Sequence, residues 1–136
     1  MKLDKEYLRS LLTVIEENPS PRPSLKGILN GMGLEDLNDD FLLHYEILAD
    51  YGFIEGIGKS SSIGLVDDYD GVDWVDANIR LTATGHEFIS NLRQSEVWEA
   101  IKENFKEGSI ETIFAVAKKL AEGFAKKRIE SVIDEF

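Results

Sequence analysis

The stretch NDDFLLHYEILADYGFIEG, residues 38–56, carries the pattern that decides the fold. Asn38 is a suitable N-cap, apolar residues recur after it at spacings of three and four, and Gly52 is placed to end a helix. The stretch therefore predicts a helix over about residues 38–50 that is followed by a sharp turn. It contains five carboxylates but no lysine or arginine.

Signals on both sides of this stretch predict the remaining elements. Asp4 and Ser24 are suitable caps for two earlier helices, and the prolines between these helices predict a stiff extended connector. An Asp70-Gly71 step between two apolar runs predicts the tight turn of a β-hairpin. The predicted elements, in chain order, are helices over about residues 4–18, 24–31 and 38–50, a hairpin over residues 63–81, and helices over about residues 82–93, 96–105 and 110–136.

This order of elements is typical of winged helix-turn-helix proteins. We therefore predict a mainly α protein with a small β-hairpin, in the α+β class. Residues 1–93 are expected to form the winged-helix domain, and residues 94–136 a C-terminal helical extension packed on the same core. A length of 136 residues suits a single core of this kind.

The negative charge is concentrated in the middle third of the chain. The net charge is −11, and residues 35–76 contain twelve acidic residues against the single base Lys59. The rest of the chain contains equal numbers of acidic and basic residues, so the whole excess lies in this segment. Such a regional excess indicates a surface for a charged partner.

The helix predicted over residues 38–50 would place acids on its outer face. On a helical wheel at ~100° per residue, Phe41, Tyr45 and Leu48 share the face expected to pack in the core. The opposite side gathers Asp39, Leu43, Glu46, Ile47 and Asp50. Helices that read the major groove carry Arg, Lys, Asn or Gln on this side, whereas a carboxylate about 4 Å from a phosphate costs ~4 kcal/mol at an effective dielectric of about 20. Standard groove recognition is therefore disfavoured.

Leu43 and Ile47 would instead form a small apolar centre ringed by acids, a layout typical of protein-binding surfaces, unless the C-terminal helix covers them. The predicted hairpin adds Asp67, Asp68, Asp70 and Asp73 to the same surface. Carboxylates spaced along a hairpin and a helix could imitate a nucleic-acid backbone. A calcium-binding loop is the weaker interpretation, because Val66 and Ala77 would occupy its first and last ligand positions.

The predicted C-terminal helix carries an apolar stripe and a basic face. The stripe contains Ile113, Ala117, Leu120 and Phe124 and continues, after a one-residue shift, through Ala125, Ile129, Val132 and Phe136. Its length exceeds what a small core needs, so we expect part of it to form a homodimer with a second subunit. The basic face, with Lys126 among its lysines, is either paired internally with Glu122 and Glu130 or docks on an acidic segment or on DNA.

Signals for catalysis are missing from the sequence. It has no cysteine and no Gly-rich phosphate loop, and its only imidazoles are His44 and His86. We therefore expect no enzymatic activity, no cofactor and no metal site, and we interpret His86 as a partly buried, hydrogen-bonded residue. The charged N-terminus and the lack of any apolar run of ~18 residues predict a cytoplasmic protein that does not enter the membrane.

The chain resembles a known family over nearly its whole length. The segments MKLDKEYLRSLL, LLHYEILADYGFIEG and RLTATGHEFISNLRQSEVWEAIKE look like those of small bacterial and prophage proteins classed as a domain of unknown function, number 2513. The resemblance implies a winged-helix fold and a phage or mobile-element setting, but no activity. LTATGHEF is also similar to the step after the wing in regulators of the MarR and PadR type, which implies structural roles for Thr82 and Gly85.

Two functions stay open at the level of the sequence. The favoured hypothesis is a non-enzymatic interaction module that binds a protein partner through the acidic surface, in one version as a mimic of nucleic acid. The alternative is a DNA-binding transcriptional regulator of winged-helix type. Its nucleic-acid-binding residues would be Arg22, Lys26, Lys59, Lys118, Lys119, Lys126 and Lys127.

Overall fold

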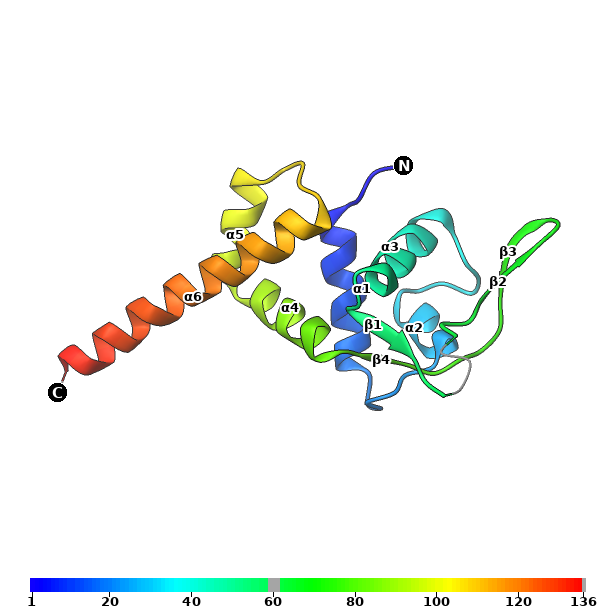
Figure 1. Ribbon diagram of the computed structural model, residues 1–136, viewed down its shortest axis with the longest axis horizontal. Coiled ribbons are helices and arrows are strands. Elements are labelled where there is room, and N and C mark those ends of the chain that lie inside the picture. Colours follow the sequence, from blue (N-terminus) through cyan, green and yellow to red (C-terminus); the bar gives the residue numbers. More distant parts are fainter. Residues whose placement is uncertain (59–61, 136) are drawn as a thin grey trace. The chain divides into compact units, whose positions relative to one another are not determined.

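The computed structural model describes residues 1–58 and 62–135 of the chain (Figure 1). These residues form a mainly helical protein with two small antiparallel sheets, which confirms the predicted α+β class. The helices are α1 (Lys5–Glu17), α2 (Leu25–Gly31), α3 (Asp39–Asp50), α4 (Ala83–Arg93), α5 (Ser95–Asn104) and α6 (Ile110–Asp134). The strands are β1 (Ile54–Gly56), β2 (Leu65–Asp68), β3 (Gly71–Trp74) and β4 (Ile79–Leu81).

The first three helices begin at the residues predicted as caps. The Asp4 carboxylate accepts hydrogen bonds from two backbone N–H groups in the first turn of α1, at 2.9 and 3.2 Å. Ser24 and Asn38 cap α2 and α3 in the same way. These contacts satisfy N–H groups that the first turn of a helix leaves without a backbone partner. Gly52 follows α3 with a φ of 74°, as expected of a glycine that ends a helix.

The β-hairpin is shorter than the predicted span of residues 63–81. Only β2 and β3 form it, with Leu65 opposite Trp74. β4 pairs instead with β1, and Ile54 lies opposite Leu81. The prediction was wrong here because β1 has only three residues, too few to show an alternating pattern, and its partner is distant in sequence.

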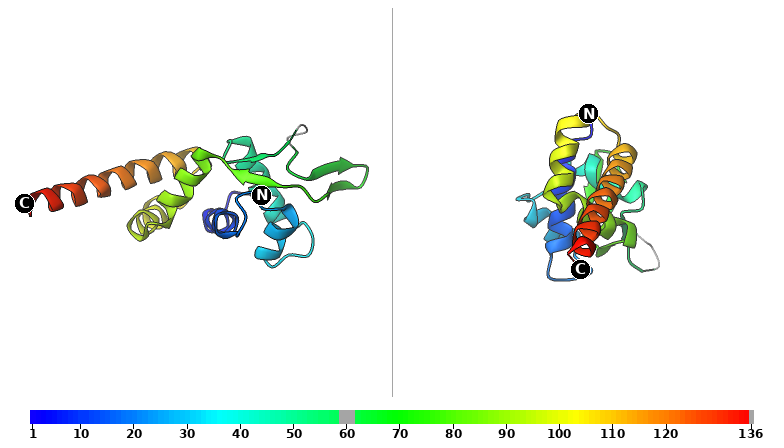
Figure 2. Two further views of the ribbon diagram at one scale, coloured as in Figure 1. Left: turned by 90° about the horizontal axis from the view of Figure 1, so that it is seen from below. Right: turned by 90° about the vertical axis from the view of Figure 1, so that its left-hand side faces the viewer.

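The hairpin turn is centred one residue before the predicted Asp70-Gly71 step. Since Asp68 and Gly71 are paired, Tyr69 and Asp70 are the two loop residues. The Asp68 carboxylate accepts a hydrogen bond from the Asp70 N–H at 2.8 Å, so a side chain closes the turn. Gly71 then begins β3 with a φ of 119°, a conformation that favours glycine. The tip of this hairpin extends beyond α2 and α3 (Figure 2).

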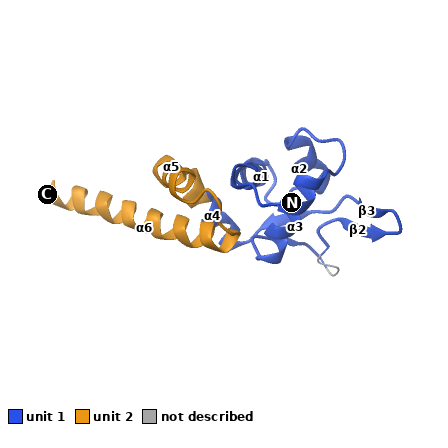
Figure 3. Cartoon of the chain, turned by 90° about the horizontal axis from the view of Figure 1, so that it is seen from above, with its two compact units in different colours: residues 1–89 blue, residues 90–136 orange. Residues whose placement is uncertain are grey.

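The chain falls into two compact units, residues 1–89 and residues 90–136 (Figure 3). α4 contributes to both units, because the division lies within it. The sequence predicts this division four residues later, after residue 93. It also predicts that both parts share one core, and this second point stays a prediction.

The core of the first unit is built from apolar helix faces and the β1–β4 sheet. α1 contacts α2, α3 and β4, and α3 contacts β1. Phe41 stacks on Tyr45 with ring centroids 5.0 Å apart, and Phe53 lies against Phe88 at 4.8 Å. Phe41, Tyr45 and Leu48 are all buried, which confirms the predicted inner face of α3. The other large, fully buried side chains include Leu8, Leu11, Leu12, Leu25, Ile28, Leu29, Ile54 and Ile79.

Thr82 connects the end of α3, the start of β1 and the start of α4. Its backbone N–H donates to the Phe53 carbonyl at 3.0 Å. Its hydroxyl donates to the Gly52 carbonyl at 2.5 Å and accepts from the Gly85 N–H at 3.0 Å. A Cβ at Gly85 would collide with the Phe53 carbonyl oxygen, so only glycine permits this close approach. Thr82 and Gly85 therefore have structural roles, as the resemblance implies.

His44 is buried on the inner face of α3 and binds the start of α1. Its Nε2 accepts a hydrogen bond from the Asp4 N–H at 2.9 Å, and its Nδ1 lies 2.6 Å from the Asp40 carbonyl oxygen. Because a backbone N–H donates and a carbonyl accepts, this arrangement requires a neutral ring with its proton on Nδ1. The ring also lies against Tyr7, with centroids 4.6 Å apart. Burial, with the nearby Asp40 carboxylate, raises the pKa of the Tyr7 phenol.

His86 is exposed, so its interpretation as a partly buried residue is wrong. The reason is the geometry of α4. Gly85 faces the Phe53 carbonyl in the core, and the next residue lies ~100° further around the helix.

The second unit contains the end of α4, together with α5 and α6. α5 contacts α6 within this unit. Ser109 caps α6 by accepting a hydrogen bond from the Thr112 N–H at 3.2 Å. The buried residues of these two helices are Val97, Trp98, Ile101, Ile110, Ile113, Ala117 and Ala121. In the predicted stripe of α6, Ile113 and Ala117 are buried and Leu120, Phe124 and Ala125 are partly buried, whereas Ile129 and Val132 are exposed. Its last member, Phe136, lies outside the described residues.

Replacing His44 with phenylalanine tests its role in the core. His44→Phe keeps an aromatic ring but removes both hydrogen bonds and leaves the Asp4 N–H without its acceptor. We expect the free energy of unfolding to fall by about 1–3 kcal/mol, as measured by urea denaturation. His86→Phe is the matched control at an exposed position and should change stability by less than about 0.5 kcal/mol. Equal losses in the two variants would contradict the role assigned to His44.

Candidate protein-binding surface

The outer face of α3 presents acids around a small apolar centre. Asp39, Glu46 and Asp50 are exposed, whereas Leu43 and Ile47 are partly buried. The inner face of the helix is buried in the core of the first unit, which fixes the orientation of the outer one. α3 therefore shows carboxylates where a groove-reading helix would show basic and amide side chains.

The β2–β3 hairpin mixes acidic and apolar side chains on both of its faces. Residues that are opposed in the register share a face, so Asp67 lies with Val72, and Asp73 lies with Val66. All four side chains are exposed. Neither face of the hairpin therefore resembles the inner face of a sheet that packs on a core.

The turn of the hairpin carries an aromatic ring between two carboxylates. Tyr69 is fully exposed, at 108% of its reference area, and Asp68 and Asp70 flank it. We use the name acidic surface for the residues of the hairpin and of the outer face of α3 taken together. Its members are Asp39, Leu43, Glu46, Ile47, Asp50, Asp67, Asp68, Tyr69, Asp70 and Asp73.

Two hydrogen bonds attach the hairpin segment to α3 and to the loop before it. The Trp74 indole N–H donates to the Asp36 carboxylate at 2.9 Å, at the base of the hairpin. The Tyr45 hydroxyl, on the inner side of α3, donates to the Ile63 carbonyl at 2.7 Å. Burial raises the pKa of the Tyr45 phenol, so this group remains a donor at neutral pH. The helix and the hairpin are therefore held together within the first unit.

The carboxylates of the acidic surface keep their charge uncompensated within the described part of the chain. None of the seven forms an ion pair with a residue in the ranges 1–58 and 62–135. Glu55, by contrast, is neutralised by Arg80, with 2.6 Å between its Oε1 and the Nη2 of the guanidinium. Unpaired exposed charges project a field that salt attenuates over about 8–10 Å. The surface is thus suited to attract a basic partner.

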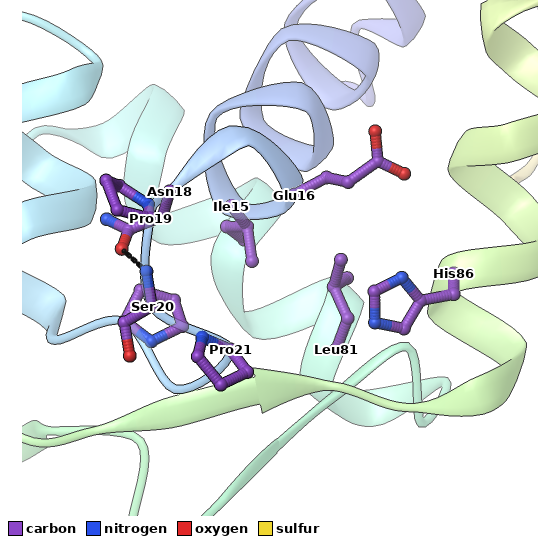
Figure 4. A pocket seen from close by; sticks show the side chains of 9 residues that line it. Ile15, Glu16, Asn18, Pro19, Ser20, Pro21, Leu81 and His86 are labelled. Carbon is purple, nitrogen blue, oxygen red and sulfur yellow. Dashed lines mark hydrogen bonds between the residues drawn. The ribbon is translucent and has the colours of Figure 1, made fainter.

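A pocket of about 250 Å³ lies beside the proline connector, on a different part of the first unit (Figure 4). Pro19, Pro21, Ile15 and Leu81 form much of its wall, and the His86 ring lies at its edge near Leu81. The residues that the structure describes include no group of three His, Cys, Asp or Glu that could hold a metal ion.

The basic residues predicted for nucleic-acid binding are divided between the two units. Arg22 and Lys26 are exposed in the first unit. Lys59 lies outside the described residues. The remaining four, all exposed on α6 in the second unit, are Lys118, Lys119, Lys126 and Lys127. No helix in the described part of the chain is both long and apolar enough to cross a membrane.

Comparison with known proteins gives a family and no activity. The family described as "Hypothetical protein (DUF2513)" matches residues 2–111. The chain belongs to this family. No curated protein and no solved structure matches the chain significantly. The DUF2513 match confirms the resemblance seen in the sequence, includes the whole acidic surface and ends at the start of α6.

Two residues around the acidic surface were missed by the sequence analysis. Tyr69 could have been found as an aromatic residue inside a turn, since turn positions are normally occupied by Gly, Pro, Asn, Asp or Ser. Asp36 gave no such signal. Its contact with Trp74 joins residues 38 positions apart, and only the folded chain reveals it.

The acids of α3 are expected to contribute little to stability. The triple variant Asp39→Asn, Glu46→Gln, Asp50→Asn should melt at an equal or slightly higher temperature in calorimetry. Glu46 and Asp50 are like charges at i,i+4 spacing near the C-terminal end of α3, where the helix dipole disfavours acids. Losing Asp39 from the first turn offsets part of this gain. A loss of more than about 1 kcal/mol would show instead that these acids hold the fold.

Proposed function

We propose that the chain is a non-enzymatic winged-helix module that binds a protein partner through its acidic surface. The order of α1, α2, α3, β1, the hairpin, β4 and α4 supports the winged-helix assignment, with β2–β3 as the wing. Thr82 supports it too, because it follows the last strand of the wing region and caps α4. In this assignment α3 has the place of the recognition helix.

The observation that carries the proposal is the full exposure of Tyr69 at the tip of the hairpin. Tyrosine is enriched at protein interfaces, where its ring supplies a large contact area for a small loss of conformational entropy. Asp68 and Asp70 flank Tyr69 in the turn and are exposed, so an aromatic side chain stands between two charged neighbours, the combination of apolar centre and polar rim that is typical of a binding surface. Leu43 and Ile47 repeat this layout among the acids of α3.

The chemistry of the acidic surface specifies the chemistry of its partner. A complementary partner is a protein with a basic surface and a recess that accepts an aromatic ring. Nucleic-acid-binding proteins have such basic surfaces, and carboxylates on the hairpin and on α3 would take the places of phosphates. In the phage or mobile-element setting that the resemblance implies, the partner would be a cytoplasmic host protein whose DNA or RNA site is occupied.

Tyr69→Ala is the most direct test of this function. A partner is isolated with the wild-type chain from a bacterial host lysate, is purified, and is then titrated calorimetrically. We expect the variant to bind at least about 30-fold more weakly, because truncating an aromatic hot spot costs about 2 kcal/mol or more. His86→Ala, at an exposed position outside the acidic surface, should bind like the wild type. Equal binding by Tyr69→Ala would remove the hairpin tip from the interface.

The role of charge is tested by two double variants of equal net charge. Asp67→Asn with Asp70→Asn removes two carboxylates from the hairpin, and Glu103→Gln with Glu107→Gln removes two from the second unit. Only the hairpin variant should slow association with the partner, and the difference should be largest at low salt. If both variants slow association equally, the partner responds to net charge and not to this surface.

The alternative function is that of a DNA-binding regulator. The exposed positions of Arg22, Lys26 and four lysines of α6 favour it. Binding to random duplex DNA, measured by fluorescence anisotropy, tests it, because log affinity falls with log salt at ~0.9 per phosphate contact. We expect no binding by the wild type at physiological salt. Duplex binding by the triple α3 variant with unchanged partner binding would favour the regulator.

A further inference from the structure

The register of the β2–β3 hairpin decides which backbone groups point away from it. Just before β2 and just after β3, the Val75 N–H donates to the Gly64 carbonyl at 2.8 Å, so these two residues form a hydrogen-bonded pair. Such pairs recur at every second position of an antiparallel ladder. The residues at the positions between them therefore direct their N–H and C=O groups outward, to the two edges of the hairpin. On β2 these outward residues are Leu65 and Asp67.

The two edges differ in what they offer to another strand. On β3 the outward residues are Val72 and Trp74, and the Trp74 N–H already donates to the Asp73 carboxylate at 2.8 Å. On β2 the outward N–H and C=O groups of Leu65 and Asp67 have no hydrogen-bond partner within residues 1–58 and 62–135. β2 is therefore the edge on which all of the outward backbone groups are available.

The side chains of β2 specify what an added strand would carry. Val66, Asp67 and Asp68 are exposed, and the hairpin tip extends beyond α2 and α3 (Figure 2). Successive side chains of a strand alternate between faces, and opposed side chains of paired strands share a face. Each of the two carboxylates would thus meet its own neighbour on an added strand, and two consecutive basic residues complement them. Leu65 and Val66 favour two apolar residues in the same way.

We propose that the protein partner adds a strand to β2 in antiparallel orientation, through an extended segment in which two consecutive basic residues precede two apolar ones. The basic residues lie opposite Asp68 and Asp67, and the apolar ones opposite Val66 and Leu65. Antiparallel pairing is the more stable arrangement per residue. Backbone hydrogen bonds supply the affinity of such an addition, and the side-chain pairs select the segment. This inference rests on the proposed function, because it specifies how the acidic surface holds its partner.

A short peptide is the direct probe. Acetyl-Thr-Arg-Lys-Val-Ile-Thr-amide carries the required pattern and is titrated at low salt into the isotopically labelled chain, whose backbone amides are followed by NMR. We expect binding in the millimolar range, because few hydrogen bonds form, with the largest shifts at the Leu65 and Asp67 amides. A peptide with glutamates in place of both basic residues should not bind. The absence of any shift at Asp67 with about 10 mM peptide, or equal binding by the acidic peptide, overturns the proposal.

N-methylated peptides separate backbone pairing from charge. Methyl groups on the backbone nitrogens of the peptide's lysine and isoleucine remove the two N–H groups that would face β2, and they leave every charge in place. This peptide should bind at least about tenfold more weakly. The matched control is methylated at the arginine and the valine, whose N–H groups would point away from β2, and should bind like the unmodified peptide. Equal binding by all three peptides overturns strand addition.

Proline substitutions in the chain identify the edge. Asp67→Pro removes an outward N–H of β2, whereas Asp67→Asn removes the same charge and keeps the N–H. The hairpin should survive both changes, because this N–H makes no bond to β3. Asp67→Pro should bind the unmodified peptide at least about fivefold more weakly than Asp67→Asn. Val72→Pro, the equivalent change on β3, should bind like the wild type. Weaker binding by Val72→Pro alone would assign the added strand to β3 and overturn the proposal.

Hydrogen exchange separates strand addition from the proposed function. In the complex with a partner isolated by the wild-type chain, exchange at the Leu65 and Asp67 amides should slow at least about tenfold, because both become hydrogen-bonded. Unchanged exchange in a complex that still requires Tyr69 overturns strand addition and leaves the proposed function intact. Shifts of the same two amides when the chain alone is concentrated would assign the edge to a second copy and also overturn the proposal.

Discussion

The rest of the first unit depends on the close approach of the α4 N-terminus to the turn after α3. Thr82 binds the carbonyls of Gly52 and Phe53 and caps α4, and Gly85 has no side chain that would separate α4 from Phe53. Two segments that lie 30 residues apart in the sequence therefore meet at one small group of atoms. This contact places β4 beside β1, and the hairpin between these strands is then held at both of its ends.

The acidic surface combines two features that stability alone does not require. α3 needs its buried inner face to pack on α1, but nothing in that packing demands carboxylates on the outer face. The hairpin likewise needs a turn, and a ring as large as that of Tyr69 contributes no packing there, because it is fully exposed. Exposed side chains that make no stabilising contact within the fold are best explained by contact with a binding partner. This reasoning favours protein binding over groove recognition by α3.

Much of the fold could be predicted from the sequence because its signals are local. The caps Asp4, Ser24 and Asn38, and the helical spacing after them, depend only on neighbouring residues. The errors at His86 and at the hairpin turn concern local geometry, whereas two features that the sequence did not predict involve partners that are distant in sequence. The pairing of β1 with β4 and the burial of His44 against Asp4 are set by tertiary contacts that no local pattern encodes. In the candidate site, the exposure of the α3 acids could be predicted from helical periodicity. The hydrogen bond between Trp74 and Asp36 could not be predicted, because it joins residues that are distant in sequence.

The isolation of the β2–β3 hairpin has a consequence for the protein in concentrated solution. Within residues 1–58 and 62–135, neither outer edge of this two-stranded sheet has a strand partner. An exposed edge offers unpaired backbone groups to strands of other molecules, which is a common route to aggregation. Asp67 and Asp68 on one strand and Asp73 on the other would be brought close to the carboxylates of a second molecule when a hairpin adds to either edge. The carboxylates of the hairpin therefore also oppose edge-to-edge aggregation, and they do so whether or not a partner is bound.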